Sequence, residues 1–165
     1  MEKAVLKTLA YADIFDYPLK AWEVHKWLIG KSLSLQQVEK ILEKLKQKKL
    51  ISNQKEFYFL SKRTMLVSKR LTRQQQSKKL IIQAKLISLV LKFIPGIKLV
   101  GISGALAMNN AQVDDDIDLF VVTSKNRLWL IRLLTLIFFT LIIKRRRPND
   151  SRQQAAGKFC LNTIL

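Results

Sequence analysis

The sequence predicts an α+β chain built from two parts, and three observations support this. Helical spacing of apolar residues recurs in three short segments near the N-terminus, and a hairpin pattern follows them. A basic, polar stretch then precedes a long amphipathic helix. Beyond that helix, two short apolar strands are separated by small residues, with aspartates crowding the start of the second strand. We expect domains over residues 1–62 and 77–165, joined by a basic linker over 63–76.

Composition narrows the class of protein. The chain has 165 residues, enough for one or two small domains, and its 48% hydrophobic content excludes a disordered chain. Thirty Lys and Arg stand against twelve Asp and Glu, a formal net charge of +18. Such an excess favours a polyanionic partner, either nucleic acid or an anionic membrane surface. The alternative is a solvated basic surface around an anionic nucleotide.

The chain has one cysteine and one histidine. A single cysteine excludes an intramolecular disulfide and a cysteine-based metal site, and its use predicts a reducing, cytoplasmic location. Cys160 lies between Phe159 and Leu161, so we expect a small core residue. His25 has no metal ligand at helical spacing and is interpreted as structural or exposed. The first residues lack the layout of a secretory signal.

The first domain is predicted to contain three helices and a hairpin. The helices cover about residues 3–12, 21–29 and 34–48, and the hairpin covers 50–60. The third helix begins with a capping signal, Ser34 followed by Gln37. Its apolar residues keep helical spacing: Leu35, Val38, Ile41, Leu42 and Leu45.

Three helices followed by a hairpin resemble a winged helix-turn-helix domain. In members that bind nucleic acid, the third helix enters the major groove. The resemblance implies that Lys40, Lys44 and Lys48 contact phosphates. The alternative is that these lysines are solvated and the domain packs on a partner. The aromatic residues are expected to form the domain core rather than a base-stacking platform: Trp22, Trp27, Phe57, Tyr58 and Phe59.

Two long helices are predicted in the second domain. The first covers residues 77–94 and ends at Pro95. The second covers 125–144, and its charge-free run after Arg132 is only about half of the roughly 20 apolar residues that a membrane span needs. We therefore favour a helix buried against a sheet over a membrane span, although the basic run 144–147 would suit a cytoplasmic anchor.

Between these helices, the sequence places carboxylates beside a turn of small residues. An apolar strand over 99–102 runs into Ser103, Gly104 and Ala105. The next strand begins among Asp114, Asp115, Asp116 and Asp118, and side-chain alternation puts three of these on one face, with Asp115 on the other. Clustered hard oxygen ligands commonly bind divalent metal ions. A last strand is predicted over 159–165.

This arrangement resembles the nucleotidyltransferase superfamily that includes DNA polymerase β, especially its small bacterial members. The family pattern is Gly-Ser followed, after a short spacing, by Asp-hydrophobic-Asp. Gly104 and Asp116-Ile117-Asp118 match it, whereas the family serine is Ala105 here and a serine, Ser103, lies on the other side of the glycine. The resemblance implies a partial α/β domain with a short mixed sheet.

The resemblance also implies a reaction. Asp116 and Asp118 would hold two Mg²⁺ ions, and Ser103, Gly104 and Ala105 would bind the phosphates of a nucleoside triphosphate. The protein would then be a magnesium-dependent nucleotidyltransferase that moves a nucleoside monophosphate to a hydroxyl of RNA, a protein or a small molecule. Three basic residues are candidates for triphosphate contacts or for solvated charges: Lys125, Arg127 and Arg132.

A third carboxylate completes the family site, on a strand further along. After the second long helix the sequence offers only Asp150, in a polar loop behind Pro148, and we do not expect it to take that role. The resemblance thus predicts a domain that is incomplete at its C-terminus, and it leaves two alternatives open: an active enzyme, or a chain that binds nucleotide or metal without catalysing transfer. The alternative function is a non-catalytic winged-helix protein that binds nucleic acid and carries a vestigial nucleotidyltransferase domain.

Overall fold

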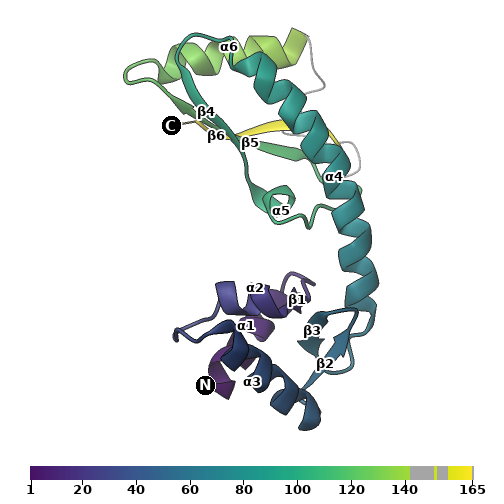
Figure 1. The fold of residues 1–165 in the computed structure, drawn as a ribbon. Helices are drawn as coiled ribbons and strands as arrows, with labels where there is room; N and C mark the ends of the chain where they lie inside the picture. The colour runs from purple at the N-terminus through teal and green to yellow at the C-terminus, as the bar shows by residue number, and fades with distance from the viewer. Residues whose placement is uncertain (142–150, 152–155, 165) are drawn as a thin grey trace. The chain divides into compact units, whose positions relative to one another are not determined.

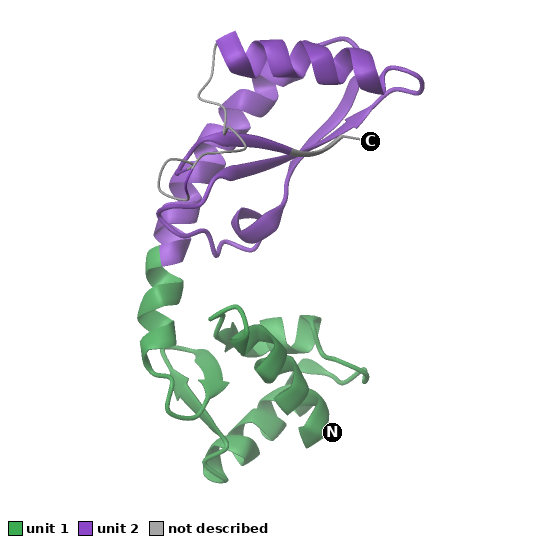
Figure 2. Ribbon diagram, turned by 180° about the vertical axis from the view of Figure 1, so that it is seen from behind, with its two compact units in different colours: residues 1–72 green, residues 73–165 purple. Residues whose placement is uncertain are grey.

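The computed structural model describes residues 1–141, 151 and 156–164, and these form a mixed α+β protein. The chain divides into two compact units, unit 1 (Met1–Thr72) and unit 2 (Arg73–Leu165) (Figure 2). The division falls within the segment 63–76. Among these described residues, three strands pair into one sheet in each unit.

Unit 1 combines helices with an antiparallel sheet in the order β1-β3-β2 (Figure 1). Its elements before the long helix are α1 (Glu2–Asp13), β1 (Leu19–Lys20), α2 (Ala21–Lys26), α3 (Leu35–Gln47), β2 (Ile51–Gln54) and β3 (Phe57–Leu60). The core joins the helices to the sheet through buried side chains, among them Val5, Leu9, Leu19, Val24, Val38, Leu42, Leu45 and Ile51.

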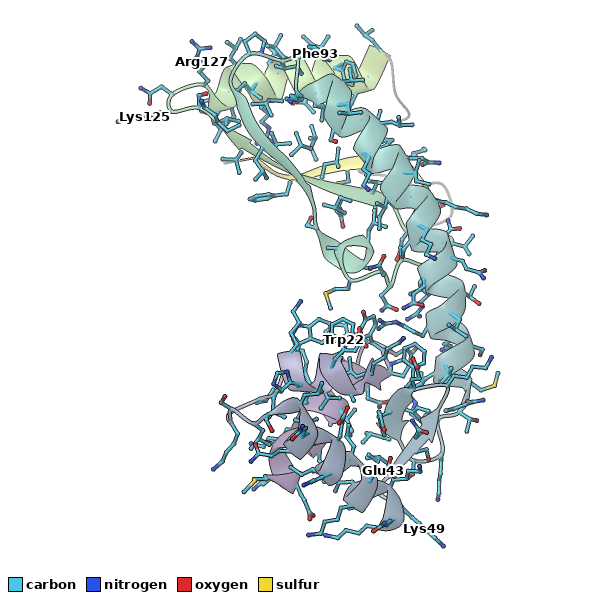
Figure 3. All side chains as sticks on the ribbon, viewed as in Figure 1. Trp22, Glu43, Lys49, Phe93, Lys125 and Arg127 are labelled. Atoms are coloured by element: carbon cyan, nitrogen blue, oxygen red, sulfur yellow. The ribbon has the colours of Figure 1, made fainter. Side chains whose placement is uncertain are left out.

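A local capping signal explains where α3 begins, whereas the end of α2 is accompanied by a contact with α1. Ser34 Oγ accepts from the Gln37 amide at 3.3 Å, and Gln37 Oε1 accepts from the Ser34 amide at 2.9 Å, so the expected capping box is present. Helix α2 ends at Lys26, earlier than predicted, and the Ile29 amide donates instead to Thr8 Oγ1 at 3.1 Å. The expectation that Trp22 lies in the core is wrong, because its side chain is 52% exposed (Figure 3).

Helix α4 (Met65–Leu91) runs through most of the segment expected to be a linker. Its first turns bury Leu66 and Val67 against Phe57 and Phe59 of β3. Arg, Lys and Gln, which dominate the rest of the segment, are strong helix formers, so polarity alone did not indicate a break. The helix ends before Pro95, which disfavours helical geometry in the residue preceding it.

Unit 2 contains a mixed sheet in the order β4-β5-β6. Beside the greater part of α4, its described elements are β4 (Ile97–Ile102), α5 (Gly104–Ala107), β5 (Ile117–Thr123), α6 (Leu128–Leu141) and β6 (Phe159–Ile164). Strand β5 is central: it pairs antiparallel with β4 and parallel with β6. Side chains of β5 can therefore contact residues of both β4 and β6.

The two faces of β5 have different surroundings. Ile117, Leu119 and Val121 are buried, whereas Asp118 and Phe120 on the alternate face are half-buried. The buried face belongs to a cluster that also contains Leu80, Ala84 and Leu91 of α4 and Phe139 of α6. The helices therefore pack on the face away from Asp118.

Helix α6 packs through one side only. Ile131, Thr135 and Phe139 are buried, and the exposed apolar side chains are Trp129, Leu130, Leu133, Leu134, Ile137 and Leu141. Across the part of the chain that the structure describes, every helix is too short or too polar to serve as a membrane span. The basic run 144–147 and Asp150 lie outside the described residues.

Candidate metal centre

A glycine turn joins β4 to α5 and brings the chain against Asp118. Gly104 has a φ of +66°, in the left-handed region that favours glycine. The preceding Ser103 amide donates to the Asp118 carbonyl oxygen at 3.0 Å. A Cβ added to Gly104 would lie 2.6 Å from Asp118 Oδ2. The absence of a side chain at position 104 therefore leaves the space that the carboxylate occupies.

Two carboxylates converge at the start of β5. Asp118 projects from the strand, while Asp116 lies in the loop just before it. One ligand atom from each of these side chains lies within 4.8 Å of the other. Negative charges at this separation repel, and a bound cation would remove the repulsion.

Cys160 supplies a third potential ligand. It is the Cα partner of Asp118 in the parallel β5–β6 ladder, and its sulfur lies within 4.8 Å of the ligand atoms of both Asp116 and Asp118. The side chain is half-buried. The expectation of a small core residue is therefore wrong. The structure instead places the thiol beside two carboxylates with which it could share a metal ion. The sequence signal was missed because the pairing joins strands far apart in the chain.

Backbone hydrogen bonds hold the aspartate loop against the start of β6. The Asp115 carbonyl accepts from the Gly157 amide at 3.0 Å, and the Ile117 amide donates to the Lys158 carbonyl at 2.8 Å. Asp115 Oδ2 accepts from the Gln112 amide at 2.8 Å, so Asp115 stabilises the turn that precedes β5. Asp114 is not part of the three-residue group.

The basic residues considered for triphosphate contacts lie elsewhere in unit 2. Lys125 and Arg127 follow the opposite end of β5 from Asp116 (Figure 3). At roughly 3.3 Å per residue the strand spans about 20 Å. Arg132 is exposed on α6, with its guanidinium 5.8 Å from the centre of the Trp129 ring. The structure does not bring these three residues to the carboxylates.

The lysines considered for nucleic-acid contacts lie on an α3 surface of mixed charge. Lys44 and Lys48 form ion pairs with Glu2 at 2.9 and 2.7 Å. Hydrogen bonds from Lys48 and then Lys44 lower the pKa of Glu2 to about 2. Lys40 is exposed on a shallow surface shared with Glu43, which Figure 3 labels. Intramolecular pairing thus competes with phosphate contacts.

Comparisons of this chain with protein-family models, with curated proteins and with solved structures each find no match. Function must therefore be inferred from the residues themselves.

Proposed function

We propose that unit 2 is a nucleotidyltransferase-like domain that binds a nucleoside triphosphate together with divalent metal ions. The reaction would transfer a nucleoside monophosphate to a hydroxyl acceptor. The observation that carries this proposal is the convergence of Asp116 and Asp118 beside the Gly104 turn. Their carboxylate oxygens are suitable ligands for Mg²⁺, the cation expected from the sequence. The antiparallel β4–β5 pair that flanks the turn agrees with the family resemblance.

The residues of the turn and those at the start of the strand would have separate roles, phosphate binding and cation binding. Asp116 and Asp118 would bind the cations, which when bound neutralise charge on the phosphates. Gly104 and Ala105, at the exposed turn, would offer backbone N–H groups to the phosphates, whereas Ser103, whose amide donates to the Asp118 carbonyl, would offer its hydroxyl. The bond between the acceptor oxygen and the α-phosphorus forms as the bond to pyrophosphate breaks. The hydroxyl proton passes to solvent water.

Binding of ATP without metal, with Mg²⁺ and with Zn²⁺ tests the proposal. Asp116→Asn and Asp118→Asn should each weaken metal-dependent ATP binding by at least about tenfold in isothermal titration, since each removes a charged ligand. Asp114→Asn removes the same charge from the same loop outside the three-residue group, and should change the affinity far less. Equal affinities in the wild type and both site variants would overturn the proposal.

Transfer itself has a separate readout. The chain is incubated with ATP labelled at the α-phosphate, and the label is followed into RNA, protein and small hydroxyl compounds. Labelling of one acceptor class by the wild type but not by Asp118→Asn would identify the acceptor. Metal-dependent binding without labelling of any class would reduce the proposal to nucleotide binding.

A second candidate function rests on unit 1, which we propose is a winged helix that binds nucleic acid. Its element order, with the β2–β3 hairpin directly after α3, supports this assignment. Lys40, Lys44 and Lys48 would contact phosphates from α3. The ion pairs to Glu2 and the neighbouring Glu43 weaken this candidate relative to the first.

Salt dependence tests the second candidate. Replacing Lys40, Lys44 and Lys48 with Ala should lower the slope of log affinity against log salt by up to about three for duplex DNA, roughly one per lost phosphate contact. Replacing the exposed Lys3, Lys7 and Lys31 is the matched control. Identical slopes in the two triple variants would remove α3 from the interface.

A further inference from the structure

The third potential ligand of the candidate metal centre is a thiol rather than a carboxylate. Cys160 lies directly across from Asp118 in the β5–β6 ladder, and the two oxygen ligands and the sulfur lie within 4.8 Å of one another. In a tetrahedral zinc site with bonds of 2.0–2.3 Å, ligand atoms are about 3.3–3.8 Å apart. Small side-chain rotations would therefore bring all three donors onto one ion.

The position of the sulfur is set by packing around it. Phe159, the neighbour of Cys160, is buried and stacks on Phe139 of α6, with ring centres 5.9 Å apart. The hydrogen bond from the Ile117 amide to the Lys158 carbonyl lies at the start of the β5–β6 ladder and fixes its register there. On the other side, Gly104 leaves open a space that a Cβ would fill at 2.6 Å from Asp118 Oδ2. The three donors thus come from elements that the backbone holds together.

The chemistry of this donor set fits Mg²⁺ poorly. Mg²⁺ demands octahedral oxygen coordination and keeps several waters, whereas sulfur is a ligand for softer ions. Zn²⁺ and Co²⁺ accept carboxylate and thiolate ligands together, and three protein ligands leave a fourth position open for water or a substrate oxygen. A mixed set of two oxygens and one sulfur therefore selects against the cation expected from the sequence.

We propose that Asp116, Asp118 and Cys160 form a three-ligand site that binds a thiophilic divalent cation of the Zn²⁺ class in preference to Mg²⁺. The inference rests on the proposed function, because it takes the same two carboxylates as metal ligands. It adds that the sulfur determines which ion the site selects. The nucleoside triphosphate would then meet an ion with one open coordination position.

Cobalt provides a direct test, because Co²⁺ replaces Zn²⁺ and reports its ligands by absorption. The purified full chain is stripped of metal and titrated with Co²⁺. We expect a thiolate-to-cobalt charge-transfer band in the near ultraviolet and visible bands typical of tetrahedral coordination, both abolished by one equivalent of Zn²⁺ and unaffected by excess Mg²⁺. A wild-type titration with no charge-transfer band would overturn the inference without any variant.

Two substitutions at one position sharpen the test. Cys160→Ser should lower Zn²⁺ affinity by about 10–100-fold or more, while Cys160→Asp should shift the preference toward Mg²⁺ by supplying a third oxygen. Circular dichroism checks that both variants fold. Zn²⁺ affinity unchanged in Cys160→Ser would overturn the inference.

The outcomes separate the two proposals. If Asp116→Asn loses metal-dependent ATP binding while Cys160→Ser matches the wild type in every metal, the proposed function stands and the thiol plays no part. If the aspartate and cysteine variants all bind metal and ATP as the wild type does, both proposals fail.

Discussion

The acidic side chains described above have different neighbours in units 1 and 2. In unit 1, carboxylates meet bases of the same unit: Glu23 pairs with Arg70 at 2.8 Å, and Asp13 pairs with Arg63 at 2.6 Å. In unit 2, Asp116 and Asp118 converge on each other and on a thiol. Opposite charges that meet inside one fold stabilise it, whereas like charges brought together favour a cation from outside. The paired charges of unit 1 are therefore structural charges, whereas our proposal for unit 2 takes Asp116 and Asp118 as metal ligands.

The Glu23–Arg70 pair is the clearest case of structural charge. Both side chains are buried, and the guanidinium lies 3.4 Å from the centre of the Tyr17 ring. Burial raises the pKa of Glu23 and lowers the pKa of Arg70 to about 10, because loss of water disfavours both charged forms. The direct hydrogen bond between the two side chains offsets part of this cost. Removing one partner would leave the other charge buried alone.

Breaking this pair should have the largest effect. Arg70→Met is expected to lower the free energy of unfolding of unit 1 by about 3–5 kcal/mol, because it leaves Glu23 buried without a base. Urea denaturation followed by tryptophan fluorescence measures it. Trp22 and Trp27 lie in unit 1, so a Trp129→Phe background confines the signal to that unit.

The matched control for this prediction removes both charges. Glu23→Gln combined with Arg70→Met should recover most of the lost stability, since no buried charge remains. A loss of under about 1 kcal/mol in Arg70→Met alone, the range of an exposed pair, would show that the pair is not structural.

A change at the turn of unit 2 should have an intermediate effect on stability and a specific effect on binding. Gly104→Ala is expected to cost about 1–2 kcal/mol because of the positive φ. It should also weaken Co²⁺ or Zn²⁺ binding by at least about tenfold, because the new Cβ displaces the Asp118 carboxylate. Thermal unfolding and metal titration measure the two effects.

Gly30 offers a control for backbone strain alone. It has a φ of +76° and nothing within 4 Å of an added Cβ. Gly30→Ala should therefore cost a similar amount of stability and leave metal affinity unchanged. If Gly104→Ala kept full metal affinity, the turn would not support the metal centre.

The smallest effect is expected at the exposed pairs of Glu2. Its pKa is lowered to about 2 by hydrogen bonds from Lys48 and Lys44, so its contribution to stability is present above pH 4.5 and is lost as the pH falls toward 2. Glu2→Gln should slightly lower the urea midpoint at pH 7. The difference from the wild type should vanish near pH 2 and shrink in high salt. A difference that stayed constant with pH would exclude the charge as its cause.

The elements that could be predicted from the sequence are those whose signals are local. The α3 helix follows from the Ser34 cap and its apolar spacing, and the hairpin follows from alternating residues around a polar tip. Strand β1 was missed because its two residues are strand only through pairing with Tyr58 and Phe57. The first turns of α4 were interpreted as linker because Arg70, a charged residue, takes a core position that hydropathy assigns to solvent.

The candidate site divides in the same way. The proximity of Gly104 to Asp118 follows from the antiparallel pairing of the consecutive strands β4 and β5, in which Ile102 opposes Leu119, so the order of these segments in the sequence was informative. Strand alternation did not apply to Asp116, which lies before β5, and its convergence depends on the loop. The position of Cys160 beside Asp118 could not be predicted from the sequence. It depends on the parallel pairing of β6 with β5 and on the register of that pairing.

That register has a consequence for insertions and deletions. Cys160 opposes Asp118 only while Phe159 opposes Ile117 and Leu161 opposes Leu119. A slip of β6 by one residue in either direction would set the hydrocarbon of Phe159 or Leu161 opposite Asp118 and would turn alternate side chains to the other face. The stacking of Phe159 on Phe139 opposes such a slip. An insertion or deletion just before β6 could thus remove Cys160 from the candidate metal centre. Its effect would equal that of replacing the cysteine, although the sequence would still contain all three ligands.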